Sequence, residues 1–98
     1  MEYADVSQDE LADIKAPPHS IEAEQSVLGG LMLDNNAWDT VSEVVTEDNF
    51  YRHDHRLVYR TMGKLVNNAQ PLDVVTLSEE LDRVGELDNA GGLEYLVD

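Results

Sequence analysis

The sequence contains no cysteine, and this absence excludes disulfide frameworks, cysteine-ligated zinc sites and thiol catalysis. It is also typical of a reducing compartment. Basic residues are scarce, because six lysines and arginines face 21 aspartates and glutamates, and the net charge is −15. Binding to a phosphate backbone relies on lysine and arginine displacing counterions. We therefore expect no direct DNA binding, and the acidity by itself is explained by solubility.

Long apolar segments are also missing. No stretch approaches the roughly 20 apolar residues that cross a bilayer. Acidic residues follow Met1, where a secretory signal would have a basic segment and an apolar run. We therefore expect a soluble, cytoplasmic protein without membrane contact.

Only three prolines occur, and the pair at residues 17 and 18 divides the chain, because a helix cannot run through it. Residues 1–14 carry five acids and no base. This composition predicts a disordered acidic tail over residues 1–16, although its few apolar residues could instead form a short partner-binding helix. The hydrophobic fraction of 42% is enough for one small packed domain, which we place at residues 17–98.

Apolar residues recur at helical spacing after the prolines, and no strand pattern or internal repeat competes with them. Ser20 is a suitable N-cap for a first helix. The apolar positions of this helix are Ile21, Ala23, Val27, Leu28, Leu31 and Met32. We expect the first helix to end, and a second to be capped, at Asp34, Asn35 and Asn36. The apolar face of the second helix comprises Trp38, Val41, Val44 and Val45.

The clearest apolar stripe predicts a third helix from about residue 54 to residue 67. It consists of Leu57, Val58, Thr61, Met62, Leu65 and Val66. Asp73 is expected to cap a fourth helix, and Gly85 to follow its last turn as a C′ glycine. The buried face of the fourth helix is predicted to be Val74, Leu77, Leu81 and Val84. The sequence thus predicts an all-α fold, a small helical bundle of about four complete helices.

A fifth helix is predicted to begin near Leu93, and it is cut at Asp98 after less than two turns. We therefore expect the chain to be a piece of a longer protein.

Gly29 and Gly30 lie inside the first predicted helix, where each costs about 1 kcal/mol relative to alanine. Such a cost suggests a close approach of another backbone, or a kink. We hypothesise that both glycines lie against a neighbouring helix. Substituting Gly30 by alanine should then destabilise the domain.

Catalytic and ligand-binding motifs are absent from the sequence. Gly63 and Lys64 do not complete a phosphate loop, since Val58 stands at the position of its first glycine and no serine or threonine follows. His53 and His55 flank an aspartate, but residues two apart on a helix diverge by about 200° and cannot share a metal ion. We predict no catalytic residue, no metal and no cofactor, and we expect the aromatic residues Trp38, Phe50 and Tyr59 to be core residues.

Four of the six basic residues form one band along the third predicted helix. They are spaced by four and comprise Arg52, Arg56, Arg60 and Lys64. Residues 52–64 carry a net charge of +3, which leaves −18 on the remainder. The band could simply pair with neighbouring acids such as Asp48, each exposed pair being worth under about 1 kcal/mol. It could alternatively receive an acidic partner or a nucleic acid.

Four sequence segments occur in an order and at a spacing that characterise a known family. They are PPHSIEAEQSVLGGLM at 17–32, DNFY at 48–51 with His55 four residues later, PLD at 71–73 followed by Thr76 and Leu77, and GGLEYL at 91–96. Together they resemble the opening of the bacterial replicative DNA helicases of the DnaB family. The resemblance covers about residue 15 to the end, and residues 1–14 do not contribute to it.

The resemblance implies an all-helical N-terminal domain that forms a collar on a hexameric ring helicase. In that family the collar assembles from dimers, docks primase and contacts helicase loaders. ATP and Mg²⁺ belong to a separate C-terminal motor domain. This chain stops before that motor and before the helical hairpin that completes the collar, so neither ATP hydrolysis nor unwinding can be carried over to it. The implied location is the replisome on the nucleoid, in the bacterial cytoplasm.

Leu93, Tyr95 and Leu96 begin an element whose packing partners are missing, and we expect some of these apolar side chains to be exposed and to bind a partner. The basic band is the second candidate partner-binding surface. A competing hypothesis is a free-standing acidic adaptor or DNA mimic. A small enzyme is a third possibility, but it would need a nucleophile or a metal site that the sequence lacks.

Overall fold

The computed structural model describes residues 20–93 and Leu96. The predicted acidic tail, Tyr95 and Val97 lie outside the described residues. Within them, every regular element is helical, which confirms the all-α prediction. The elements are α2 (Ile21–Leu33), η2 (Asn35–Ala37), α3 (Trp38–Val44), η3 (Glu47–Asn49), α4 (His53–Asn67) and α5 (Val74–Arg83).

The predicted caps of the first and fourth helices are confirmed, whereas α3 has Ala37 at its N-cap without a side-chain hydrogen bond, because Asp34 caps η2 instead. The Ser20 hydroxyl accepts a hydrogen bond from the Ala23 amide at 3.2 Å and caps α2. Asp73 caps α5 in a reciprocal capping box with Thr76. The Asp73 carboxylate accepts from the Thr76 amide at 2.8 Å, and the Thr76 hydroxyl accepts from the Asp73 amide at 3.1 Å.

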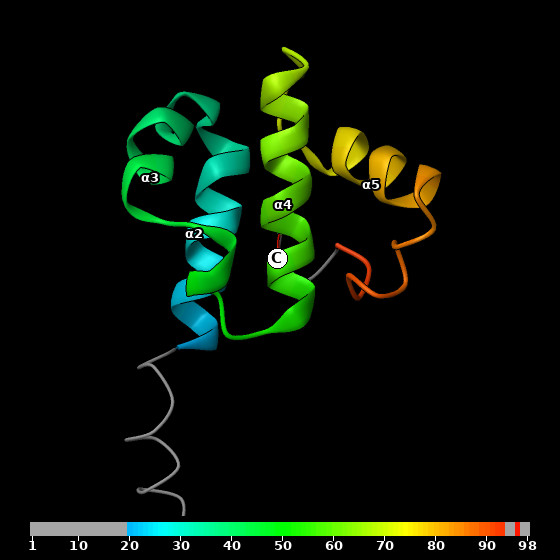
Figure 1. Ribbon diagram of the computed structural model, residues 1–98, viewed down its shortest axis with the longest axis horizontal. Coiled ribbons are helices and arrows are strands. Elements are labelled where there is room, and N and C mark those ends of the chain that lie inside the picture. Colours follow the sequence, from blue (N-terminus) through cyan, green and yellow to red (C-terminus); the bar gives the residue numbers. More distant parts are fainter. Residues whose placement is uncertain (1–19, 94–95, 97–98) are drawn as a thin grey trace, which may run out of the picture.

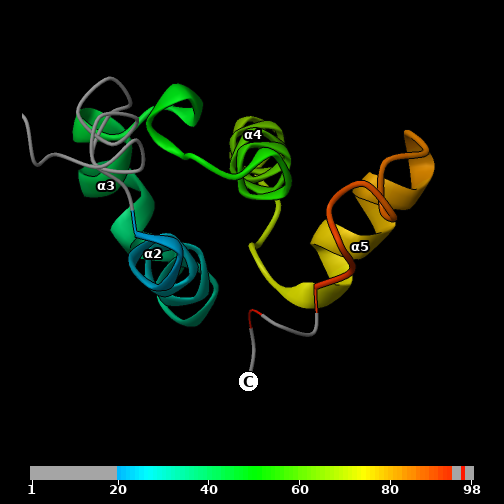
Figure 2. The ribbon, with the colours of Figure 1, turned by 90° about the horizontal axis from the view of Figure 1, so that it is seen from below.

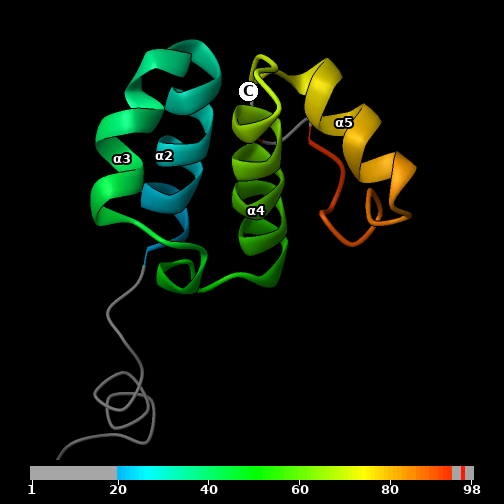
Figure 3. The same cartoon turned by 45° about the horizontal axis from the view of Figure 1, so that its top comes forward.

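Helix α4 occupies the centre of the fold. Figure 2 views it end-on, with α2 and α3 on one side and α5 on the other. Helices α2 and α4 run side by side in the same direction (Figures 1 and 3). The intervening α3 lies on the side of α2 that faces away from α4, and it returns the chain to the end of the fold at which α2 begins. Parallel neighbouring helices need such a return segment, so η2, α3 and η3 together place α4 against α2.

Asn35 ties two corners of the chain together. Its Nδ2 donates to the Leu31 carbonyl at 2.8 Å and to the Leu72 carbonyl at 2.9 Å, and its Oδ1 accepts from the Leu72 amide at 2.8 Å. The side chain thus satisfies both backbone groups of a residue 37 positions away. It fixes the end of α2 relative to the loop between α4 and α5.

The core follows the predicted apolar faces except at Ala23, Val44 and Val84, which are exposed. Its fully buried members come from all three long helices, from the loop before α5 and from the segment after it: Leu28, Leu31, Val58, Met62, Leu72, Leu77, Leu81 and Ala90. Val44 is 78% exposed, because α3 turns Trp38, Val41 and Val45 toward the core and Val44 lies at the edge of that face. Val84 is 43% exposed, because it is the C-cap residue at which the chain leaves α5.

The hypothesis that both glycines of α2 lie against a neighbouring helix is wrong for Gly30, and Gly29 lies against the backbone of the C-terminal segment. A Cβ placed on Gly29 would lie 3.1 Å from the carbonyl oxygen of Leu96. A Cβ on Gly30 would have no neighbour within 4 Å, since Gly30 faces outward. The close approach therefore comes from the C-terminal segment and concerns only one of the two glycines.

Candidate docking surfaces and their electrostatics

The basic band on α4 is engaged within the chain at its N-terminal half. Arg52 forms an ion pair with Asp54. The Nε of Arg56 donates to the carbonyl oxygen of Phe50 at 2.7 Å, which ties the start of α4 to the preceding loop. These two arginines therefore hold the entry into α4.

The C-terminal half of the band pairs with acidic side chains of neighbouring elements. The Nε of Arg60 donates to Glu47 at 2.7 Å, and this contact raises the pKa of Arg60. Lys64 lies 3.0 Å from Glu80 on α5, which also receives Arg83. Arg83 and Lys64 together lower the pKa of Glu80 to about 2. This pairing favours the structural interpretation of the band, with Glu47 rather than Asp48 as the acid, while its role in partner binding stays a prediction.

The predicted C-terminal surface of Leu93, Tyr95 and Leu96 is buried at its two described residues. Leu93 and Leu96 are 2% and 8% exposed and belong to the core cluster. The expectation that apolar side chains of this segment are exposed is therefore wrong for these two residues. They belong to the core formed with the described helices, so their burial does not require a further element. Tyr95 lies outside the described residues.

The two histidines around Asp54 diverge, as predicted. His53 is exposed, whereas His55 is fully buried. Among residues 20–93 and Leu96, no group of three or more histidine, cysteine, aspartate or glutamate side chains could hold a metal ion.

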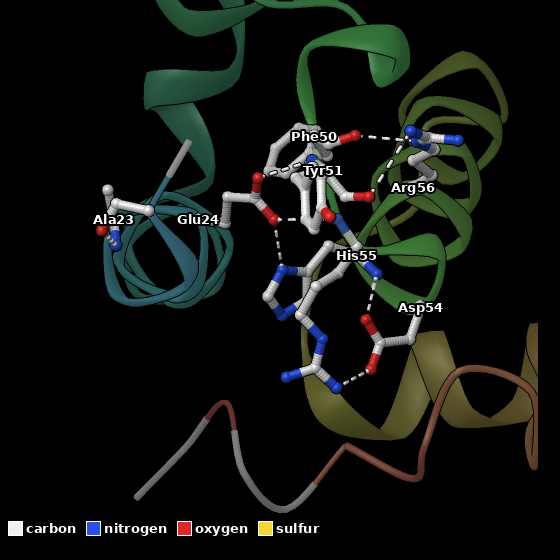
Figure 4. Close-up of polar contacts among 9 residues, drawn as sticks. Ala23, Glu24, Phe50, Tyr51, Asp54, His55 and Arg56 are labelled. Atoms are coloured by element: carbon white, nitrogen blue, oxygen red, sulfur yellow. Dashed lines mark hydrogen bonds and ion pairs between the residues drawn. The ribbon is translucent and has the colours of Figure 1, made fainter. Parts of the chain in front are cut away.

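His55 belongs to a buried polar network that the sequence analysis did not find. Its Nδ1 lies 2.7 Å from Oε1 of Glu24, and Glu24 is itself only 7% exposed (Figure 4). The same carboxylate accepts hydrogen bonds from the amides of Tyr51 at 2.6 Å and Arg52 at 3.4 Å. One side chain of α2 therefore holds the loop before α4 and the first turn of α4.

The electrostatics of Glu24 favour the carboxylate form. Burial alone would raise its pKa, but the Tyr51 amide, the His55 ring and the Arg52 amide together hold the pKa below its ordinary value. In the sequence, the presence of an acid at this position was already explained, because a negative charge in the first turn of a helix interacts favourably with the helix dipole. No sequence signal connects it to His55, which is 31 residues away.

The aromatic residues are structural, as predicted. Phe50 and Tyr59 are buried, and the Tyr59 ring lies 4.9 Å from Phe50 and 5.0 Å from the partly buried Trp38, measured between ring centroids. The Tyr59 hydroxyl donates to the Val45 carbonyl at 2.7 Å, and burial raises its pKa. This cluster joins α3 to α4.

The described surface has two hollows next to residues of the network and of the basic band. A cavity of about 210 Å³ lies between α2 and the segment that follows α3, with Glu24 and Phe50 in its wall. A wider groove of about 450 Å³ lies between α4 and α5, and Arg60 and Lys64 of the basic band line it. None of the described helices has the length and the apolar character to span a membrane.

Comparison with known proteins identifies the family. Residues 16–98 match the family described as the DnaB-like helicase N terminal domain. The replicative DNA helicase DnaB of Buchnera aphidicola (subsp. Acyrthosiphon pisum) is 53% identical over 85 residues, which are 87% of this chain and 18% of that protein. The corresponding protein of Haemophilus influenzae is 45% identical over 92 residues, which are 94% of this chain and 20% of that protein.

A solved structure agrees with these matches. The crystal structure of the N-terminal domain of DnaB helicase from Mycobacterium tuberculosis superimposes with a TM-score of 0.76 and 43% sequence identity, over 83% of this chain and 56% of that chain. The chain thus spans about a fifth of the length of the curated relatives that it matches. Sequence and fold together show that the chain belongs to the DnaB-like helicase N-terminal domain family.

Proposed function

We propose that the chain is the interaction and oligomerisation part of a hexameric replicative DNA helicase, and that it docks primase and helicase loaders during DNA replication in the bacterial cytoplasm, at the nucleoid. The observation that carries the proposal is the match of almost the whole chain to the N-terminal domain of replicative helicases. The paired charges and the helical core are consistent with a scaffold that presents surfaces to other proteins.

Self-association is the first property to measure. We expect a monomer at micromolar protein, or a dimer that forms only as the concentration rises. A stable interface needs about 800 Å² from each partner, and we do not expect the incomplete last helix predicted for this chain to supply that area. Sedimentation velocity of this chain, beside a longer chain extended as in the relatives, gives the comparison. The longer chain should form tight dimers. If both chains stay monomeric at every concentration, the oligomerisation part of the proposal fails.

Primase binding is the second property, and the basic band provides a matched pair of variants. Arg60→Gln removes a half-exposed base of the band, while Arg83→Gln removes a base of α5 that is equally engaged with one acid. We expect Arg60→Gln to weaken primase binding by the longer chain and Arg83→Gln to leave it unchanged. Equal losses would assign the effect to overall charge and exclude the band.

The domain itself is proposed to bind no nucleotide, since ATP and Mg²⁺ would belong to the motor domain of the parent helicase. We expect no clustered amide shifts in NMR spectra when ATP is added to millimolar concentration. Saturable shifts on one surface would contradict this proposal.

The net charge of −15 favours one other candidate, a free-standing acidic adaptor or DNA mimic. Such a protein would compete with DNA for a basic partner, whereas a helicase domain would be followed in its gene by a phosphate loop. Reading the gene beyond the codon for Asp98 distinguishes the two.

A further inference from the structure

The cavity between α2 and the segment that follows α3 has an unusual wall. Its apolar part is formed by Ala23 and Val27 of α2, by Val45 at the end of α3, and by Phe50. The carboxylate-bearing side chain of Glu24 belongs to the same wall. Figure 4 shows Glu24 extending from α2 toward Phe50 and the start of α4. A buried glutamate therefore forms part of the wall of a largely apolar cavity.

The size of the cavity suits one side chain. Its volume of about 210 Å³ lies below the roughly 300 to 1,000 Å³ of pockets that hold drug-sized ligands. Interfaces commonly gain most of their energy from a few anchor residues that fill small pockets of this kind. The cavity is thus suited to one anchor residue of a protein partner.

We infer that this cavity receives a single lysine or arginine side chain of a basic protein partner, with its alkyl stem on Val27, Val45 and Phe50 and its cationic head toward Glu24. Long basic side chains combine an apolar stem with a charged head, and they bury the stem while the head meets a polar group. The inference gives the proposed docking domain a specific contact. Its binding chemistry does not depend on the helicase assignment.

A cationic occupant is favoured over a purely apolar one by the desolvation of Glu24. The carboxylate accepts hydrogen bonds from two amides and the His55 ring, yet it keeps its negative charge at neutral pH. An apolar group would remove the remaining water from this charge without compensation, whereas an ammonium or guanidinium compensates for it. The net charge of −15 also attracts basic partners at long range.

The test uses two probes of equal length that differ in charge. Pentylammonium chloride and 1-pentanol are titrated separately into the ¹⁵N-labelled chain at pH 7, and amide shifts are followed by NMR. We expect saturable shifts that cluster at the amides of Ser20, Val45 and Asn49, which border the cavity. Pentylammonium should bind about two- to fivefold more tightly than pentanol, the range expected of one solvent-accessible ion pair.

One matched pair of variants and one charge variant keep the inference falsifiable. Ala23→Leu fills the cavity from an exposed helical position and should abolish the saturable shifts, while Ser26→Leu, exposed on the same helix outside the cavity, should preserve them. Glu24→Gln should remove the preference for the cation. If Glu24→Gln fails to fold, the comparison of the two probes on the parent chain tests the preference for the cation, and the comparison of Ala23→Leu with Ser26→Leu tests the binding place. Shifts spread over the acidic surface, shifts that survive Ala23→Leu, or equal binding of pentanol would overturn the inference, and none of these results bears on sedimentation or primase binding.

Discussion

Ala69 is strained in the native structure, and replacing it by glycine should stabilise the domain. It is the only non-glycine residue with a positive φ in the described part of the chain, at 57°. It occupies the C′ position of α4 in a Schellman motif. The Gln70 amide donates to the Leu65 carbonyl at 2.8 Å, and the Ala69 amide donates to the Val66 carbonyl at 3.0 Å. Both hydrogen bonds require the left-handed conformation at residue 69.

The magnitude follows from two opposing effects. A left-handed conformation costs an L-residue roughly 1–2 kcal/mol, and glycine avoids this cost. Glycine also makes the unfolded chain more flexible, which opposes folding by about 0.4–1 kcal/mol. We therefore expect Ala69→Gly to raise the free energy of unfolding by about 0.5–1 kcal/mol. For a domain of this size, the melting temperature should rise by about 2–8 °C.

Gly85 provides the reciprocal experiment, because α5 ends in the same motif. Gly85 has a φ of 76°, its amide donates to the Asp82 carbonyl at 3.0 Å, and no atom lies within 4 Å of the position of an added Cβ. Gly85→Ala should therefore lose about 0.5–1 kcal/mol through backbone strain alone. Urea unfolding at 25 °C measures both variants, with Ala23→Gly in α2 as a control that should lose about 1 kcal/mol. If Ala69→Gly were no more stable than the parent chain, the strain argument would be refuted.

Three further predictions use the same unfolding assay. Gly30→Ala should raise the free energy of unfolding by about 0.5–1 kcal/mol. Gly29→Ala should raise it less or lower it, because only a Cβ on Gly29 meets a backbone oxygen. Equal increases would contradict that contact. Asn35→Ala should lower the free energy of unfolding by about 2–3 kcal/mol, since four hydrogen bonds break and partly buried backbone groups lose their partner. A loss below about 0.5 kcal/mol would contradict this. The pKa values of Glu24 and Glu80 are lowered from 4.5, so both carboxylates stabilise the fold above that pH, and this stability is lost as the pH falls through their folded-state pKa values, about 2 for Glu80. Glu24→Gln should flatten the pH dependence of stability below pH 4.5, and an unchanged slope would exclude Glu24 as its source.

Helices and their starts could be predicted from local sequence, because their signals lie within a few residues of the structure they produce. Ser20 and Asp73 cap helices as expected, and the stripe on α4 is buried. Helix ends show where such signals fail. Gly85 marked the end of α5, whereas Ala69 ends α4 with the same hydrogen bonds and carries no glycine signal. The alanine is tolerated because the motif satisfies the last carbonyls of α4.

Long-range contacts could not be predicted from the residues alone. The hydrogen bonds of Asn35 to Leu72 and the contact of Glu24 with His55 each join residues more than 30 positions apart. In the sequence, Asn35 is explained as a capping residue and Glu24 as an acid in the first turn of a helix. Neither residue therefore indicates a distant partner, and the Glu24 carboxylate becomes buried only because α4 lies against α2.

The segments that carry the family resemblance meet in space, and this explains why they are informative as a set. The first segment contributes Glu24, whose carboxylate holds the second segment at Tyr51 and His55. It also contains Gly29, which the fourth segment approaches at Leu96. The third segment is held by Asn35, just beyond the first. Helix α2 and the residues that follow its C-terminal end are thus the common partner of the other three segments. The spacing between the segments reflects the length of chain needed to return to that helix.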